Sequence, residues 1–165
     1  MKYFILLTTL FLSHLAVAQP KLTLNPKGFD PIDTPINKSP ENFIKQTKEW
    51  VSGYYRGEAD IQDLDSRTIL ITAFNDDAFF YRNLGETYDY KIKYTLKFTL
   101  NDNTYTAIFQ VKEIYIENKL IQSKITDYFN SSGKLKEGYQ DVKPSLEKTV
   151  NSILKSHYNF LVNYR

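Results

Sequence analysis

The chain has no cysteine, one tryptophan and only two histidines among its 165 residues. Without cysteine it forms no disulfide and no thiolate metal centre, and so few histidines do not predict a zinc or copper site. Its 21 basic and 19 acidic side chains nearly balance. That balance argues against a dedicated nucleic-acid or membrane-surface binder, because such proteins carry a clear basic excess. We therefore expect no metal, no cofactor and no nucleic-acid partner.

The N-terminal residues have the layout of a secretory signal peptide. One lysine precedes an apolar run that ends near Leu12, and Ala16-Val17-Ala18 supplies a small-residue cleavage box. The apolar run is shorter than the ~20 residues that span a bilayer. We predict that residues 1–18 are removed after Ala18, that no transmembrane segment remains, and that the protein is secreted or periplasmic. A secreted chain without disulfides fits a bacterial envelope.

The remaining chain predicts a leader and one domain. Residues 19–30 mix proline, glycine and asparagine with little apolar periodicity, which predicts a flexible leader. A single α+β domain then covers residues 31–165. It begins with a short strand at 31–36, whose two prolines restrict it to a sheet edge.

Two amphipathic helices are expected. The first has Ser39 as its N-cap and Pro40 at its first position, and Gly57 is placed to end it in a left-handed conformation. The second starts near Asp141, with Pro144 in its first turn, and repeats apolar residues at helical spacing to the C-terminus. Each helix has one apolar face to bury.

Four strands lie between the helices. Residues 58–64 and 67–74 predict two of them, followed by a longer loop at 75–86. Residues 88–100 alternate strictly between apolar and polar, and a turn at Asp102-Asn103 pairs them with 104–116 so that both faces match. The apolar parity changes after Val111, which predicts a β-bulge at Lys112-Glu113. Residues 118–140 permit either a helical turn or a loop.

This order of strand, helix, four strands and helix predicts a two-layer α+β sandwich. Both helices would cover the apolar face of one antiparallel sheet of about five strands, and the lysine-bearing face would be open to water. The pattern over roughly residues 31–120, including Lys48-Glu49-Trp50 in the first helix, resembles a bacterial family of secreted proteins known as a domain of unknown function. That resemblance implies a TATA-binding-protein-like fold and an extracytoplasmic location, and it implies no activity.

Few residues suggest catalysis. His157, the only histidine beyond the predicted signal peptide, lies on the apolar stripe of the last helix, so we expect it at the core edge with a backbone hydrogen-bond partner. The alternative is a small secreted hydrolase that uses His157 as general base, although no second catalytic group is identifiable and no catalytic residue is assigned. Five aspartates could bind calcium or act as acid and base, but their spacing does not fit a calcium loop and favours turns. They are Asp60, Asp63, Asp65, Asp76 and Asp77.

The lysine face has two interpretations. It could meet an acidic or phosphate-bearing partner, or it could be a solvated face that discourages aggregation. Sheets that bind nucleic acid interleave aromatic with basic residues, and the alternation here puts the aromatics on the opposite face. The lysines concerned are Lys91, Lys93, Lys97 and Lys112.

The best candidate for a binding site is the run Phe79, Phe80, Tyr81 and Arg82 in the predicted loop. Four consecutive bulky residues cannot all point into one core, and such residue types commonly anchor partners. Alternatively, the loop folds back over an open sheet edge. We predict a secreted or periplasmic non-enzymatic binding or interaction module whose partner is an unidentified envelope protein or ligand.

Overall fold

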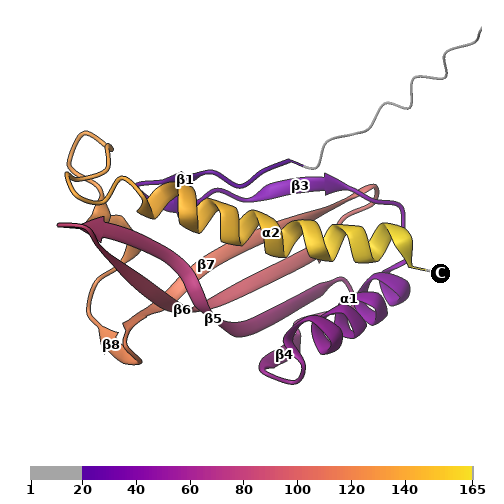
Figure 1. Ribbon diagram of the computed structural model, residues 1–165. Coiled ribbons are helices and arrows are strands. Elements are labelled where there is room, and N and C mark those ends of the chain that lie inside the picture. The colour runs from indigo at the N-terminus through magenta and orange to yellow at the C-terminus, as the bar shows by residue number, and fades with distance from the viewer. Residues whose placement is uncertain (1–19, 165) are drawn as a thin grey trace, which may run out of the picture.

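The protein is an α+β sandwich in which two helices cover one face of a six-stranded antiparallel sheet (Figure 1). The computed structural model describes residues 20–164, so the predicted signal peptide and its cleavage site lie outside the described residues. The strand order is β3-β7-β6-β5-β4, with β8 paired to β7. The main elements are β3 (Ile32–Pro35), α1 (Pro40–Tyr55), β4 (Ala59–Asp63), β5 (Thr68–Asn83), β6 (Glu86–Leu100), β7 (Thr104–Ile116), β8 (Lys119–Ile121) and α2 (Val142–Asn163). The predicted fold class is confirmed, and within residues 20–164 no helix is long and apolar enough to cross a membrane.

The β6–β7 hairpin has the predicted register. Leu100 pairs with Tyr105, and the same register continues to the pair of Tyr94 with Val111. The pairing then shifts by one residue, which leaves Lys112 unpaired as the predicted bulge. Beyond it Ile92 pairs with Ile114, so the apolar side chains of both strands stay on the core face.

The helix ends largely follow the sequence signals. The Ser39 hydroxyl accepts a hydrogen bond from the Asn42 N–H at 3.4 Å, and Pro40 occupies the first helical position. At the other end Arg56 already takes the left-handed conformation, with φ 52°, before Gly57. At the start of α2, Asp141 contributes its backbone carbonyl to Ser145 and makes no side-chain cap.

The predicted loop at 75–86 is wrong, because β5 continues to Asn83 and turns at Leu84-Gly85 into β6. The polar residues that suggested a loop form a wide bulge: Asn75 pairs with Ile92 and Phe79 with Tyr90, so residues 76–78 oppose Lys91 alone. Two extra residues leave the alternation unchanged, and for this reason the side chains of Phe79 and Tyr81 return to the core face.

Residues 20–30, predicted as a flexible leader, pack on the domain, the first part against α2 and Phe29 against β7. They form a small hairpin of β1 (Leu24–Asn25) and β2 (Gly28–Phe29), and β1 runs beside α2 (Figure 1). Leu22 and Leu24 are buried. The Leu22 N–H donates to Asn151 at 2.8 Å and the Leu24 N–H donates to Glu147 at 2.7 Å. Two leucines spaced two residues apart were the signal for an ordered extended segment.

Residues 118–140 cover the end of the sheet that is remote from α1. After β8, a short 3-10 helix (Ile125–Tyr128) supplies the helical turn that the sequence permitted. Its residues Ile125 and Tyr128, with the following Phe129, are buried in the main core. The segment is therefore a structured part of the domain.

His157 lies in the middle of the core rather than at its edge. Its ring stacks on Phe98 with centroids 3.9 Å apart, and none of its surface is exposed. Its Nε2 lies 3.1 Å from the hydroxyl of Thr47, so the partner is a side chain and not the expected backbone group. Complete burial lowers the pKa of His157 to about 3, because the charged imidazolium would have to leave water.

The open face of the sheet is less purely polar than the alternation predicted. Phe74 and Tyr115 lie there, with ring centroids 6.0 Å apart. Lys91 and Lys93 place their ammonium groups 5.0 and 5.8 Å from the Phe74 ring, which is cation–π geometry. The same two lysines pair with Asp76 and Glu113.

Candidate ligand-binding groove

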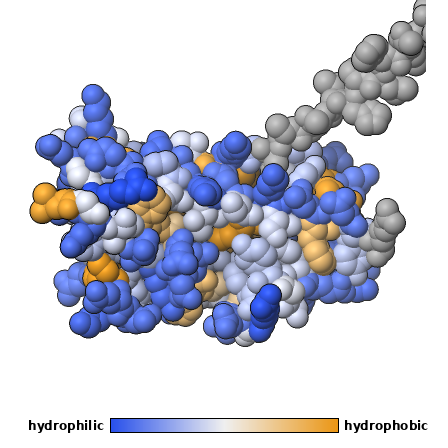
Figure 2. All heavy atoms as spheres, in the orientation of Figure 1, coloured by the Kyte–Doolittle hydropathy of each residue, from blue (hydrophilic) through white to orange (hydrophobic). Residues whose placement is uncertain are grey.

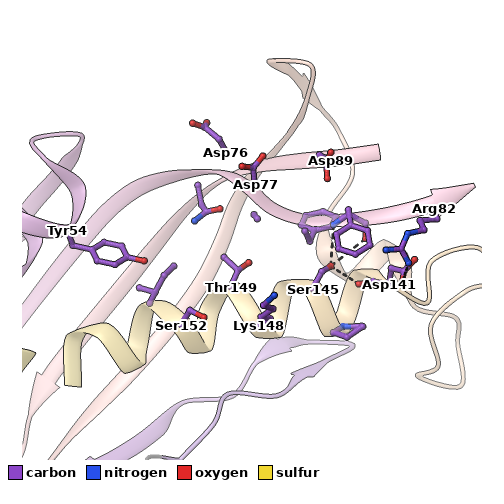
Figure 3. Close-up of a pocket in the computed structure, with 16 residues that line it drawn as sticks. Tyr54, Asp76, Asp77, Arg82, Asp89, Asp141, Ser145, Lys148, Thr149 and Ser152 are labelled. Atoms are coloured by element: carbon purple, nitrogen blue, oxygen red, sulfur yellow. Dashed lines mark hydrogen bonds and ion pairs between the residues drawn. The ribbon is translucent and has the colours of Figure 1, made fainter. Parts of the chain in front are cut away.

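A groove of about 780 Å³ runs between β5 and α2 (Figure 3). It exists because β4 pairs with β5 only as far as Ala73, and the wide bulge that follows leaves this edge of β5 without a strand partner within residues 20–164. Its wall residues come from β5, α2, α1 and β6. They are Tyr54, Asn75, Asp76, Asp77, Ala78, Phe79, Phe80, Arg82, Asp89, Asp141, Pro144, Ser145, Lys148, Thr149, Ser152 and Ile153.

The α2 wall is a stripe of hydroxyl groups. Ser145, Thr149 and Ser152 are spaced four and three residues apart, which places them on one side of the helix. Ser145 also joins α2 to the strand edge, because its hydroxyl accepts the Phe80 N–H at 3.2 Å and donates to the Asp141 carbonyl at 2.6 Å. Sequence reasoning followed only the apolar stripe of this helix and missed the polar stripe beside it.

The opposite wall is acidic. Asp76, Asp77 and Asp89 lie together on that side in Figure 3. Asp76 forms an ion pair with Lys91 at 2.7 Å. Within the described residues, Asp77 and Asp89 have no ion-pair partner, so their carboxylates remain free to accept hydrogen bonds. The basic groups in the lining are Arg82 and Lys148.

The two ends of the groove are closed by aromatic residues. At one end Arg82 lies 3.6 Å from Asp141 and 4.9 Å from the centre of the Phe80 ring. At the other end Tyr54 stacks on Trp50 with centroids 5.1 Å apart, and Tyr54 keeps 41% of its surface exposed. Partial burial raises the pKa of Tyr54, so its hydroxyl stays protonated and can donate a hydrogen bond.

The structure separates the four residues predicted as a site. Phe79 is 1% exposed and stacks on Tyr90 at 4.7 Å, so its ring belongs mainly to the core. Tyr81 stacks on Tyr88 and does not line the groove. Phe80 and Arg82 alternate to the other side of the strand and line it, and the binding role of the run stays a prediction.

Within residues 20–164, the face of the molecule drawn in Figure 2 shows no large apolar patch that would be a second candidate binding surface. Figure 2 shows a mainly hydrophilic surface with apolar side chains in small separate areas. Among the described residues, no group of three histidine, cysteine, aspartate or glutamate side chains is placed to hold a metal ion. The chemistry of the groove is therefore that of carboxylates, hydroxyls and two cations.

Comparison with known proteins identifies the fold. No family model and no curated sequence matches the chain. A TBP-like protein from Parabacteroides distasonis ATCC 8503 is similar in structure, with a TM-score of 0.52 and 16% identity over 82% of this chain and 93% of that one. A DUF4468 family protein from Bacteroides ovatus ATCC 8483 is similar over 89% of this chain and 90% of that one, with a TM-score of 0.55 and 10% identity. The chain therefore has a TBP-like fold, as the sequence resemblance implied.

Proposed function

We propose that this protein is a secreted, non-enzymatic binding module and that the groove between β5 and α2 takes its ligand. One observation carries the proposal: the wide bulge opens a strand edge opposite a stripe of hydroxyl groups, and Asp77 and Asp89 beside it have no ion-pair partner among the described residues. Asp77, Asp89, Thr149 and Ser152 therefore remain available in the groove, and a few convergent polar groups in a concave site are typical of a ligand site.

The lining sets the class of ligand. Ionised carboxylates only accept hydrogen bonds, whereas the hydroxyls of α2 both donate and accept. Four carboxylates against two cations also make the groove acidic overall. A small ligand rich in N–H or O–H donors fits these walls, either a neutral saccharide or an amine.

The hydrolase alternative has less support. A general base must reach its substrate within hydrogen-bond distance, directly or through one water. The His157 ring is fully enclosed by core residues, among them Phe98 and Trp50, and it does not line this groove.

The proposal that the protein is secreted rests on the sequence of residues 1–18. Mass mapping of the exported protein should find Gln19 at its N-terminus.

Trp50 provides a built-in reporter for binding. It is the single tryptophan of the chain and stacks on Tyr54 at the end of the groove. Titration with a panel of neutral saccharides and diamines should give a saturable change in its emission for one of the two classes. Salt should weaken diamine binding and leave saccharide binding nearly unchanged, because salt screens charge interactions.

Matched variants locate the site. Asp77→Asn together with Asp89→Asn should weaken binding at least fivefold, while Asp60→Asn on β4, which lies outside the groove, should leave it unchanged. No saturable response to either class, or equal binding by the double variant, would refute the proposal. Binding of anions that is lost in Lys148→Gln would assign the groove to the opposite charge class.

A further inference from the structure

The β7 edge of the sheet has a gap on the side away from the β5–α2 groove. β3 pairs with residues 104–107 of β7, and β8 pairs with residues 114–116. Between them, residues 108–113 have no strand partner on this side within the described chain. β3 begins at Ile32, directly after Pro31, and the residues before it form the β1–β2 hairpin instead of continuing the pairing with β7.

The backbone of β7 is aimed into this gap. The Ile36 N–H donates to the Asn103 carbonyl at 3.0 Å, so the odd-numbered residues of β7 point their backbone groups toward β3. In an antiparallel ladder this direction repeats every second residue. By this alternation Phe109 and Val111, which come before the bulge at Lys112, direct their N–H and C=O groups to this side, where β2 approaches β7 without pairing with it.

A small groove with an apolar floor lies at the gap. Its volume is about 350 Å³, and β7, the β1–β2 hairpin and the segment before the 3-10 helix contribute its walls. Phe29 meets Phe109 edge to face at 5.6 Å, which fixes one wall. The apolar residues of the lining are Leu24, Phe29, Phe109, Val111, Ile114 and Ile125.

Every charged residue that lines this groove is a lysine. Lys27, Lys112 and Lys124 are exposed at its rim, and none of them forms an ion pair with a described residue. The acidic residues nearest to them in sequence have hydrogen-bond partners other than the ammonium groups of these lysines. Asp30 accepts from Asn25, Glu113 pairs with Lys93, and Asp127 accepts the Lys124 backbone N–H.

From these observations we propose that the gap receives an extended acidic segment of another protein, which adds to β7 as an antiparallel strand. The backbone of the segment would bond to Phe109 and Val111, and every second side chain would enter the apolar groove. Its carboxylates would meet the three rim lysines. Main-chain bonds provide the affinity in this mode of recognition, and the groove and the charges provide the selectivity.

A protective role is the competing interpretation. Lysines and bulges at sheet edges commonly prevent unwanted strand pairing. Both interpretations place the bulge at Lys112, but protection alone predicts that every added strand is rejected. The proposal predicts that an acidic strand is accepted and a basic one is not.

The test uses an acetylated eight-residue peptide of alternating valine and glutamate, labelled for fluorescence anisotropy. The mature protein should bind it saturably, with an affinity that falls as salt rises. A peptide with lysine in place of glutamate should not bind. N-methylation of the valine nitrogens, which face β7 when the valines enter the groove, should abolish binding, whereas N-methylation of the glutamate nitrogens should leave it intact.

Variants and amide exchange complete the design. Lys112→Glu together with Lys124→Glu should weaken binding more than tenfold, and Lys155→Glu on α2 is the matched control that should not. Bound peptide should slow amide hydrogen exchange at Phe109 and Val111. Absence of saturable binding would leave edge protection as the role of these lysines and overturn the proposal. Equal binding of the two methylated peptides would also overturn it, because charge alone would then explain the affinity.

Discussion

The two ends of the core are built from the same residue types and closed in different ways. At the end near α1, the rings of Phe43, Trp50, Phe98 and His157 pack together between both helices and the sheet. At the far end, Phe79, Tyr90 and Tyr128 are covered by the irregular segment after β8. The first cluster is wholly buried, whereas the second is continued outward by the half-buried Tyr81 and Tyr139.

We infer from this difference that the end near α1 (the closed end) mainly stabilises the fold, and that the far end (the open end) leaves room for binding. A cluster sealed by two helices has one close-packed arrangement, so each ring removed there leaves a cavity. A cluster covered by a loop and flanked by an open strand edge can present polar groups without disturbing the main core. Both grooves follow stretches of β5 and β7 that have no strand partner within residues 20–164, and the β5 groove extends from this less enclosed part of the sheet back to Tyr54 on α1.

The largest loss of stability should come from a substitution in the aromatic cluster at the closed end, near α1. Phe98 is fully buried and touches His157, Tyr105 and Trp50. Phe98→Ala should lower the free energy of unfolding by ~3–5 kcal/mol, because the neighbouring rings cannot collapse into the space. Urea denaturation measures the loss, and a change below ~1 kcal/mol would mean that this cluster is not close-packed in solution.

Substitutions at two neighbouring residues of the open end should differ sharply in how much stability they cost. Phe79 is buried, so Phe79→Ser should cost ~3 kcal/mol or more. Phe80 is half-buried over the groove, and Phe80→Ser should cost roughly 1 kcal/mol, nearer to a surface substitution. Thermal or urea unfolding of both variants checks the ratio. Two equal losses would show that Phe80 also belongs to the core and would weaken its assignment to the groove.

The same contrast explains what the sequence could predict. The β6–β7 hairpin was predictable to the bulge, because a single register matches two faces at once and Lys112 is the residue that restores the match. The far half of β5 was missed because Asn75, Asp76 and Asp77 look like a loop, although Phe79 and Tyr81 resume the earlier parity. The groove itself was not predictable, since Ser145 meets the β5 edge only through tertiary packing.

His157 should make the closed end sensitive to acid. Its pKa is about 3 in the folded protein against an ordinary value of 6.5, so between these values the unfolded chain binds a proton that the folded chain does not. Lowering the pH therefore favours unfolding, by ~1.4 kcal/mol per pH unit below 6.5 and ~2 kcal/mol between pH 7 and 5. The measurement is the unfolding free energy against pH.

His157→Gln is the control for that profile. The variant should lose this part of the slope, while the carboxylates continue to contribute theirs. Because His157 has no proposed contact with ligand, the variant should also keep any binding in the groove as long as it folds. Identical slopes for the two proteins would show that water reaches the imidazole and that this end is not sealed.

The smallest effect, with the opposite sign, should come from the tip of the β5–β6 hairpin at the open end. Leu84 is 97% exposed and takes φ 50°, and Gly85 follows with φ 85°. Positive φ at both central residues is the type I′ turn, for which Asn-Gly is the favoured pair. Leu84→Asn should therefore leave stability unchanged or raise it by less than ~1 kcal/mol, and Leu84→Val should lower it slightly because a β-branched residue resists this conformation.

The measurement is the urea midpoint of unfolding of each variant, compared with that of the unchanged protein. A loss of more than ~1 kcal/mol in Leu84→Asn would mean that the leucine is packed in solution, and the far end would then be as closed as the end near α1.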